Sequence, residues 1–126
     1  LKPLARFVSF ASRGVPPEIM GIGPIQAIPA ALKNAGLTQD QIDWIELNEA
    51  FAAQALACTR AWGLADDAPH VNTYGGGISM GHPLGASGAR IAGAAARRLY
   101  ATGGKHALAT LCVGVGQGVA LSLHAV

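Results

Sequence analysis

Runs of apolar residues with a strand-like or helix-like period divide the chain into an alternating series of expected elements. Short stretches rich in β-favouring residues predict strands at 4–12, 43–47, 71–72, 105–112 and 117–126. Longer apolar stretches bounded by glycine predict helices that open within 21–24 and end near 35, and that cover 50–62 and 86–101. The order β-α-β-α-β-α-β-β predicts a single layered α/β domain over residues 1–126 with a five-stranded mixed sheet.

Local signals mark some of the element boundaries. Thr38 and Gln41 have the spacing of a capping box, which predicts one short helical turn. Gly36 and Gly63 follow apolar runs and are expected to end helices. Gly14 and the prolines that follow it are expected to end the first strand.

The two later helices are apolar on most of their faces, with many alanines in 50–62 and 86–101. A helix that is apolar all round is normally buried all round, and small side chains let neighbouring backbones approach closely. One sheet covers only one side of each helix. The pattern therefore predicts a further layer of structure outside this chain.

The composition supports a folded chain with a covered surface. Hydrophobic residues make up 51% of the sequence and charged residues 13%, and the mean hydropathy is +0.34. This balance excludes a disordered chain and is low in charge for a small domain, so some apolar surface is expected to face a partner. The sequence has no signal-peptide pattern and no apolar run of about 18 residues. Because it begins at Leu1, a fragment or a processed product is expected.

The formal net charge of +2 says little about partners. Arg90, Arg97 and Arg98 share one helical segment, but no basic stripe is interleaved with aromatic residues. This favours a solvated helix face over a nucleic-acid site, and contact with an anionic coenzyme remains a third interpretation.

The cysteines and histidines form no metal-ligand pattern. Cys58 and Cys112 have no CxxC partner and the histidines lack HxxxH spacing, so neither a disulfide framework nor a structural zinc is predicted. Cys58 and three of the histidines are expected to be structural or exposed: His70, His106 and His124.

Reactive polar residues cluster where expected strands end or helices begin. The three segments are Asn48-Glu49-Ala50-Phe51, Gly81-His82-Pro83-Leu84-Gly85 and Cys112-Val113-Gly114-Val115-Gly116-Gln117-Gly118. In open α/β sheets, sites gather at the carboxyl ends of the strands, so a common location is expected. The later glycines 114, 116 and 118 lead into a strand rather than a helix, which argues against a nucleotide-binding loop.

In this order and at these separations, the three segments resemble the carboxyl-terminal motifs of thiolases. The resemblance extends to 19–24 and 45–47, and so covers nearly the whole chain. It implies the second half of an αβαβα enzyme that makes or breaks a carbon–carbon bond by acyl transfer between acyl-CoA and acetyl-CoA. Coenzyme A thioesters would be the substrates, with no cofactor or metal. The family's amino-terminal half, which carries the nucleophilic cysteine, is absent, so the isolated chain is expected to be inactive.

The resemblance also implies residue roles. His82 matches the histidine that activates the nucleophilic thiol, and Cys112 matches the acid/base that exchanges a proton with the α-carbon of acetyl-CoA. An imidazole with a pKa of about 6.5 and a thiol of about 8.5 suit these tasks near neutral pH. Asn48 matches the residue that holds an oxyanion-hole water with His82, and Gly114 the donor of a second oxyanion hole. Three residues match the lining of the acyl pocket: Met20, Ala50 and Phe51.

Simpler interpretations stay open beside these roles. His82 would then be a structural histidine, Cys112 an inert core thiol, Asn48 a cap, and Met20 and Phe51 plain core residues. At the level of the whole chain, the alternatives are a non-catalytic thiolase-like module that binds acyl-CoA or another protein, and a relative of decarboxylating ketoacyl synthases.

Two positions depart from the family pattern. Val115 stands where thiolases often have glycine, and its β-branch disfavours a positive φ. Tyr74 replaces a smaller residue before the glycine cluster and is expected to reshape the site's entrance. The wider expectations are a homodimer or tetramer, a role in fatty-acid metabolism such as β-oxidation, and a cytoplasmic location, with an organelle left open.

Overall fold

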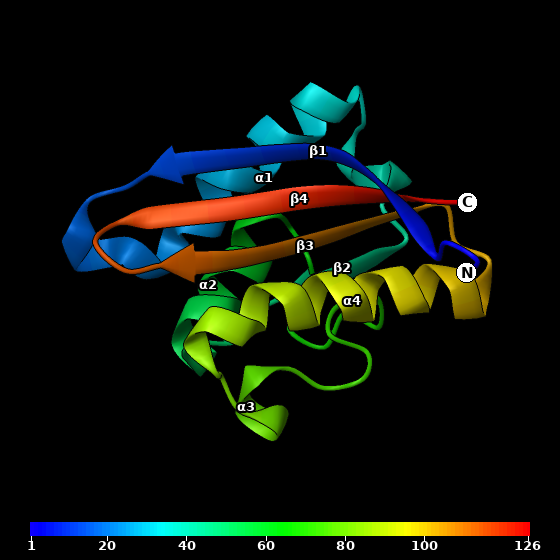
Figure 1. Cartoon of the computed structure of the whole chain (residues 1–126). Coiled ribbons are helices and arrows are strands. Elements are labelled where there is room, and N and C mark those ends of the chain that lie inside the picture. The colour runs from blue at the N-terminus through cyan, green and yellow to red at the C-terminus, as the bar shows by residue number, and fades with distance from the viewer.

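Four strands form one mixed sheet in the order β1-β4-β3-β2. They are β1 (Ala5–Gly14), β2 (Trp44–Leu47), β3 (His106–Val113) and β4 (Gln117–Ala125). In this computed structural model, which describes residues 1–126, β4 pairs antiparallel with β1 and β3, and β2 pairs parallel with β3. The carboxyl ends of β1, β2 and β3 therefore lie at the same end of the sheet (Figure 1).

The predicted fifth strand at 71–72 does not form. Val71 makes a single isolated bridge with Ile45, and Asn72 turns into the left-handed region with φ 47°. The Asn72 side chain pairs with the Leu47 backbone instead: Oδ1 accepts from Leu47 N at 2.8 Å and Nδ2 donates to Leu47 O at 2.8 Å. An amide side chain thus takes the place of further ladder bonds, so the prediction of five strands is wrong.

The three expected helices are present. They are α1 (Gly23–Ala35), α2 (Ala52–Ala61) and α4 (Leu84–Thr102). Gly36 ends α1 in the left-handed conformation, at φ 67°. The predicted turn forms as η2 (Gln39–Gln41), where the Gln41 side chain accepts from Thr38 N at 2.9 Å.

Two short helices lie where the sequence predicted only breaks or loops. They are η1 (Pro17–Ile22) and α3 (Gly77–Met80). Proline-rich and glycine-rich segments carry little apolar periodicity, which is why the pattern missed them.

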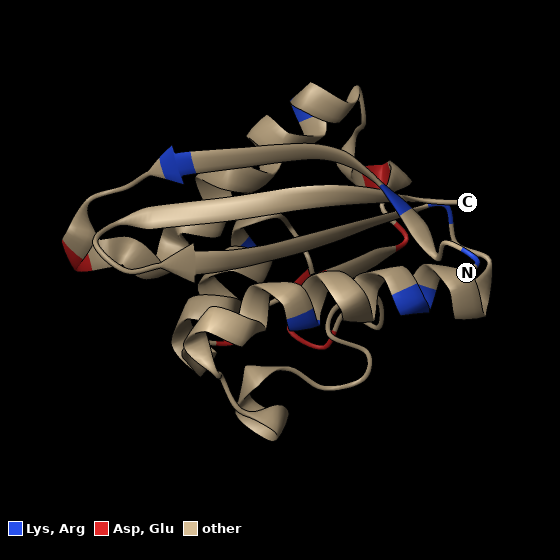
Figure 2. Cartoon of the chain, viewed as in Figure 1, with Lys and Arg blue, Asp and Glu red and all other residues tan.

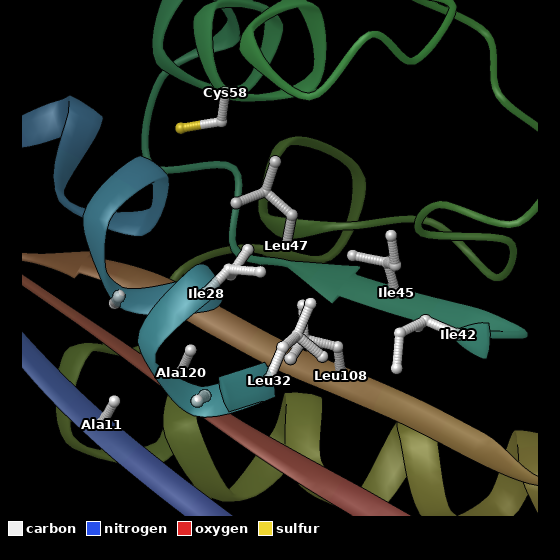
Figure 3. Close-up of a cluster of buried hydrophobic side chains, with 11 residues drawn as sticks. Ala11, Ile28, Leu32, Ile42, Ile45, Leu47, Cys58, Leu108 and Ala120 are labelled. Carbon is white, nitrogen blue, oxygen red and sulfur yellow. The ribbon is translucent and has the colours of Figure 1, made fainter. Parts of the chain in front are cut away.

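The helices cover opposite faces of the sheet and define two cores. On one face, Ile28 and Leu32 of α1 pack toward Ile45, Leu47 and Leu108 of the strands (Figure 3). On the other face, Ala95 and Leu99 of α4 pack with Ala107 and Leu123. The neighbouring residues Ala107 and Leu108 of β3 thus serve different cores, because successive side chains of a strand point to opposite faces.

Each alanine-rich helix is covered on one side only. On α4, the small residues Gly85, Ala86, Ala89 and Gly93 are exposed, and much of α2 is exposed as well. The chain therefore leaves apolar helix surface bare, as the composition led us to expect. None of the helices combines the length and the hydropathy that crossing a membrane requires.

Two of the three α4 arginines do not form a solvated face. The guanidinium nitrogens of Arg90 are buried without a hydrogen-bond partner, while the Arg98 guanidinium lies 4.0 Å from the Trp44 ring centre and 4.6 Å from that of Tyr74. Figure 2 shows the basic positions along α4. The prediction of a solvated face is wrong for this pair, because their long stems carry them inward toward buried Glu46. Burial raises the pKa of Glu46 to about 7, against the opposing influence of the two arginines.

The β3–β4 turn contains a strained valine. Val115 is 80% exposed and adopts φ 61°, which a β-branched residue rarely does. Replacing Val115 by glycine should therefore raise the free energy of unfolding by about 1 kcal/mol, seen as a higher melting temperature by circular dichroism. Val115→Ala keeps a Cβ and is expected to gain less. A glycine variant that melts below the parent chain would contradict this prediction.

Candidate active site

Asn48 lies directly after β2 and is completely buried. Its backbone N donates to Thr110 O of β3 at 2.9 Å, which continues the parallel pairing past Leu47. Its side-chain Nδ2 lies 3.4 Å from His82 Nε2, and its Oδ1 is buried with no partner. Since buried polar atoms are nearly always paired, this oxygen is expected to meet a ligand or a water.

His82 lies between α3 and α4, with its ring held at both nitrogens. Nε2 faces Asn48, while Nδ1 lies 2.6 Å from Oγ of Ser87, a fully buried residue in the first turns of α4. The sequence motifs predicted roles for His82 and Asn48 but gave none for Ser87. A serine five positions after a histidine carries no local signal, and only the start of α4 brings the two side chains together.

Glu49 fixes the glycine-rich segment before His82. Its carboxylate accepts from Ile78 N at 3.0 Å and from Asn72 Nδ2 at 3.1 Å. A Cβ at Gly77 would lie 2.8 Å from the Glu49 carbonyl oxygen, and one at Gly76 would collide with the Glu49 carboxylate. The glycines thus let α3 lie directly against the end of β2. This positioning role of Glu49 and Asn72 was also missed.

Cys112 lies in β3 at the same edge of the sheet, two positions after the residue that bonds to Asn48. It is 6% exposed, and burial raises the pKa of its thiol. By strand alternation its side chain shares the α1 face with Leu108. Burial also raises the pKa of Cys58 on α2 to about 11, with a smaller contribution from Cys112. No hydrogen bond joins Cys112 to His82 or Asn48 in this chain.

Gly114 follows β3 in the exposed turn. A Cβ there would meet no atom of this chain within 4 Å, so nothing in the chain's own packing demands glycine. This contrasts with Gly116, where a Cβ would lie 3.0 Å from Pro17 N. The requirement for glycine at 114 is expected to come from a group outside the chain.

The three predicted pocket residues lie on different segments. Met20 belongs to η1 and is partly buried, as is Ala50, while Phe51 is 59% exposed. Their role in binding an acyl group stays a prediction.

The chain alone encloses no hollow around the predicted site. Its largest hollow, about 610 Å³, lies between α2 and the loop 66–73 and is lined by neither His82 nor Cys112. Tyr74, which was expected at the entrance, packs on Arg98 beside Trp44, the first residue of β2 and thus at the far end of that strand from Asn48. Tyr74 therefore does not narrow the approach to His82 in this structure.

Known proteins match this chain closely. Residues 1–125 match the family model described as thiolase, C-terminal domain. The chain is 56% identical over 126 residues to the 3-oxoadipyl-CoA/3-oxo-5,6-dehydrosuberyl-CoA thiolase of Escherichia coli (strain K12), covering 100% of the chain and 31% of that protein. It is 53% identical over 125 residues to the acetyl-CoA acetyltransferase of Syntrophomonas wolfei, covering 99% of the chain and 32% of that protein.

A solved structure supports the relationship that the sequence comparisons found. The crystal structure of human mitochondrial 3-ketoacyl-CoA thiolase superimposes with a TM-score of 0.95 at 46% identity, covering 99% of this chain and 31% of that one. The chain spans about a third of the length of the curated relatives it matches. It has the α/β fold of that thiolase, with a four-stranded mixed sheet in this part. On sequence and structure alike, the chain belongs to the thiolase family, in which it corresponds to the C-terminal domain.

Proposed function

We propose that this chain supplies His82, Cys112, Asn48 and Gly114 to the active site of a complete thiolase, which transfers acyl groups between coenzyme A thioesters. The observation that carries the proposal is the Asn48–His82 contact, in which a buried amide oxygen has no partner beside the imidazole. A merely structural asparagine would be expected to have both ends of its amide satisfied.

The unpaired Oδ1 of Asn48 is suited to bind a water molecule that takes part in the reaction. A water that donates one hydrogen to Asn48 Oδ1 has a second hydrogen to give to a substrate oxygen. His82 Nε2–H would be the other donor, so that the two form an oxyanion hole. Such preorganised donors stabilise the negative charge that develops on a thioester oxygen, and removing one typically costs about 10²–10³ in rate.

In thiolysis, His82 takes the proton of a cysteine thiol supplied by the rest of the enzyme. The thiolate attacks the 3-keto carbon, the C2–C3 bond breaks, and its electron pair leaves as the enolate of acetyl-CoA. Cys112 gives its proton to C2. The Cys112 thiolate then takes the proton of incoming CoA, whose sulfur displaces the cysteine from the acyl group, and the departing cysteine thiolate takes back the proton held by His82. Condensation is the reverse, and the acyl group is carried as a thioester without a cofactor.

The burial of Cys112 fits its part in this scheme. A raised thiol pKa keeps the proton on sulfur near neutral pH, as a proton donor to an enolate requires. Gly114 fits as a backbone N–H donor because the space beside its Cα is open to a ligand. We assign the acyl pocket to Met20, Ala50 and Phe51.

The surface around the site is suited to bind the amino-terminal half of the enzyme, which would cover it. Large apolar side chains are exposed on the segments that border the site: Phe51, Ile78, Met80, Leu84 and Val115. Exposed apolar groups gathered in this way mark a surface that binds another part of a protein. The remainder of the enzyme would therefore bring its nucleophile to this rim, between the Asn48–His82 pair and Cys112.

The substrate belongs to the 3-ketoacyl-CoA class. Several relatives at 52–56% identity are β-ketoadipyl-CoA or 3-oxoadipyl-CoA thiolases, while one at 53% is an acetyl-CoA acetyltransferase. The sequence identities are therefore too similar to decide whether the acyl chain of the substrate is dicarboxylic or a short monocarboxylic one. A homodimer or tetramer in the cytoplasm, acting in the breakdown of 3-ketoacyl-CoA such as β-oxidation, completes the proposal.

Two experiments test this function. Full-length protein carrying this chain should cleave acetoacetyl-CoA or 3-oxoadipyl-CoA with CoA, whereas the isolated chain should show no turnover because it lacks the nucleophile. In the full-length protein, Cys112→Ala should abolish the exchange of acetyl-CoA α-protons with D₂O, while Cys58→Ala, the other buried thiol, should preserve it. A full-length protein inactive on both substrates would favour a non-catalytic binding module, and exchange that persists without Cys112 would remove its acid/base role.

A further inference from the structure

We propose that Ser87 is a positioning residue whose hydroxyl reverses its hydrogen-bonding role, and that this lets His82 act alternately as a base and as an oxyanion-hole donor. The inference rests on the proposed function, because that reaction uses His82 in both ways. In this proposal the Ser87 hydroxyl donates or accepts a hydrogen bond according to whether Nδ1 of His82 carries a proton.

The contact is short and enclosed. Ser87 Oγ lies 2.6 Å from His82 Nδ1, and Ser87 is 0% exposed. His82 Nδ1 has no other hydrogen-bond partner in the chain. Because Ser87 is part of α4, its Cα is held by the helix, and the hydroxyl is presented to the ring from a rigid support.

A hydroxyl suits a ring that must change its proton pattern. When Nε2 is a base, its lone pair is free and the proton lies on Nδ1, so Nδ1–H donates to Ser87 Oγ. When Nε2–H donates to an oxyanion from the neutral ring, Nδ1 bears the lone pair and Ser87 O–H donates to it. In the imidazolium both nitrogens donate, and Ser87 accepts again. Serine can fill all three roles by rotating one bond, because a hydroxyl has one donor and two acceptor lone pairs.

The second neighbour of the ring is also a neutral group. The Asn48 side chain places its amide Nδ2 3.4 Å from Nε2. Glu49, which follows Asn48 in the sequence, is bonded to Asn72 Nδ2 and Ile78 N. No carboxylate bonds to the ring, in contrast with triads in which an aspartate holds one tautomer. The ring thus lies between two neutral groups, of which the Ser87 hydroxyl can both donate and accept.

The test uses full-length protein with Ser87→Ala, Ser87→Thr and, as a matched control, Ser122→Ala. Ser122 is also 0% exposed, and its hydroxyl bonds to Ser9 Oγ at 2.8 Å in the sheet, away from His82. The single-turnover rate of acyl transfer to the enzyme measures how well His82 acts as a base. The rate at which the α-protons of acetyl-CoA exchange with D₂O measures how well His82 acts as an oxyanion-hole donor.

We expect Ser87→Ala to slow both steps about tenfold to a hundredfold with little change in KM. Ser87→Thr should restore both steps in part, and Ser122→Ala should leave both near the parent values. In protein with ¹⁵N-labelled histidine, Ser87→Ala should shift the Nδ1 and Nε2 resonances of His82, identified by their loss in His82→Gln.

Three outcomes would overturn the inference: rates within twofold of the parent for Ser87→Ala, equal losses in Ser122→Ala, or unchanged His82 resonances in Ser87→Ala. These resonances are measured without turnover. If the parent protein proves inactive as a thiolase, the proposed function fails, while the coupling of Ser87 to the His82 proton is still decided.

Discussion

Replacing His82 by alanine in the full-length protein is expected to lower kcat/KM for thiolysis by about 10³ or more, because one residue supplies both proton transfer and an oxyanion donor. The loss should appear mainly in kcat, since the ring contributes little to holding the CoA portion of the substrate. Alkylation of the nucleophilic cysteine by iodoacetamide near neutral pH should slow in parallel, because its thiolate loses the base that forms it.

His70 provides the matched control for this substitution. It is partly buried, and no hydrogen bond of its side chain is found, although its backbone O accepts from Ile45 N at 2.9 Å. His70→Ala should therefore leave kcat/KM and alkylation near the parent values. If His82→Ala stays within tenfold of the parent, or if both variants lose activity alike, His82 is a structural histidine.

The second large effect concerns stability, at the point where β4 crosses the start of α1. A Cβ added at Gly118 would lie 2.6 Å from Gly23 Cα and closer still to its carbonyl group. The obstacle is backbone, which cannot move aside by changing rotamer. We expect Gly118→Ala to lower the free energy of unfolding by about 3 kcal/mol or more, and the melting temperature by about 10 °C.

Two further variants sharpen this test. Gly23→Ala should cost about as much, because its Cβ would lie 2.6 Å from Gly118 Cα, and the double variant should cost less than the sum of the two. Gly93→Ala on α4 meets open space and should raise stability by about 1 kcal/mol, since alanine favours a helix over glycine. A Gly118→Ala variant as stable as the parent in urea unfolding would show that the crossing can relax.

Much of the fold follows from signals that act over a few residues. The extents of α1, α2 and α4 were predicted within a few positions, since periodicity and terminal glycines such as Gly36 act locally. The prediction failed at 71–72, where the Asn72 side chain ends the pairing by bonding to Leu47. It also failed for Arg90 and Arg98, because the direction of a long side chain depends on what lies beneath the helix.

The candidate site likewise combines features that local sequence signals predicted with contacts that they did not. The motif residues, the order of the main helices and strands, and the excess of apolar surface that a partner would cover could all be inferred from the sequence. Three contacts emerged only when the chain was folded: Asn48 and His82, 34 positions apart, touch, Ser87 bonds to the second ring nitrogen, and Tyr74 packs on Arg98 instead of at the entrance. Periodicity and capping depend on neighbours along the chain, whereas these contacts depend on how α4 lies against β2.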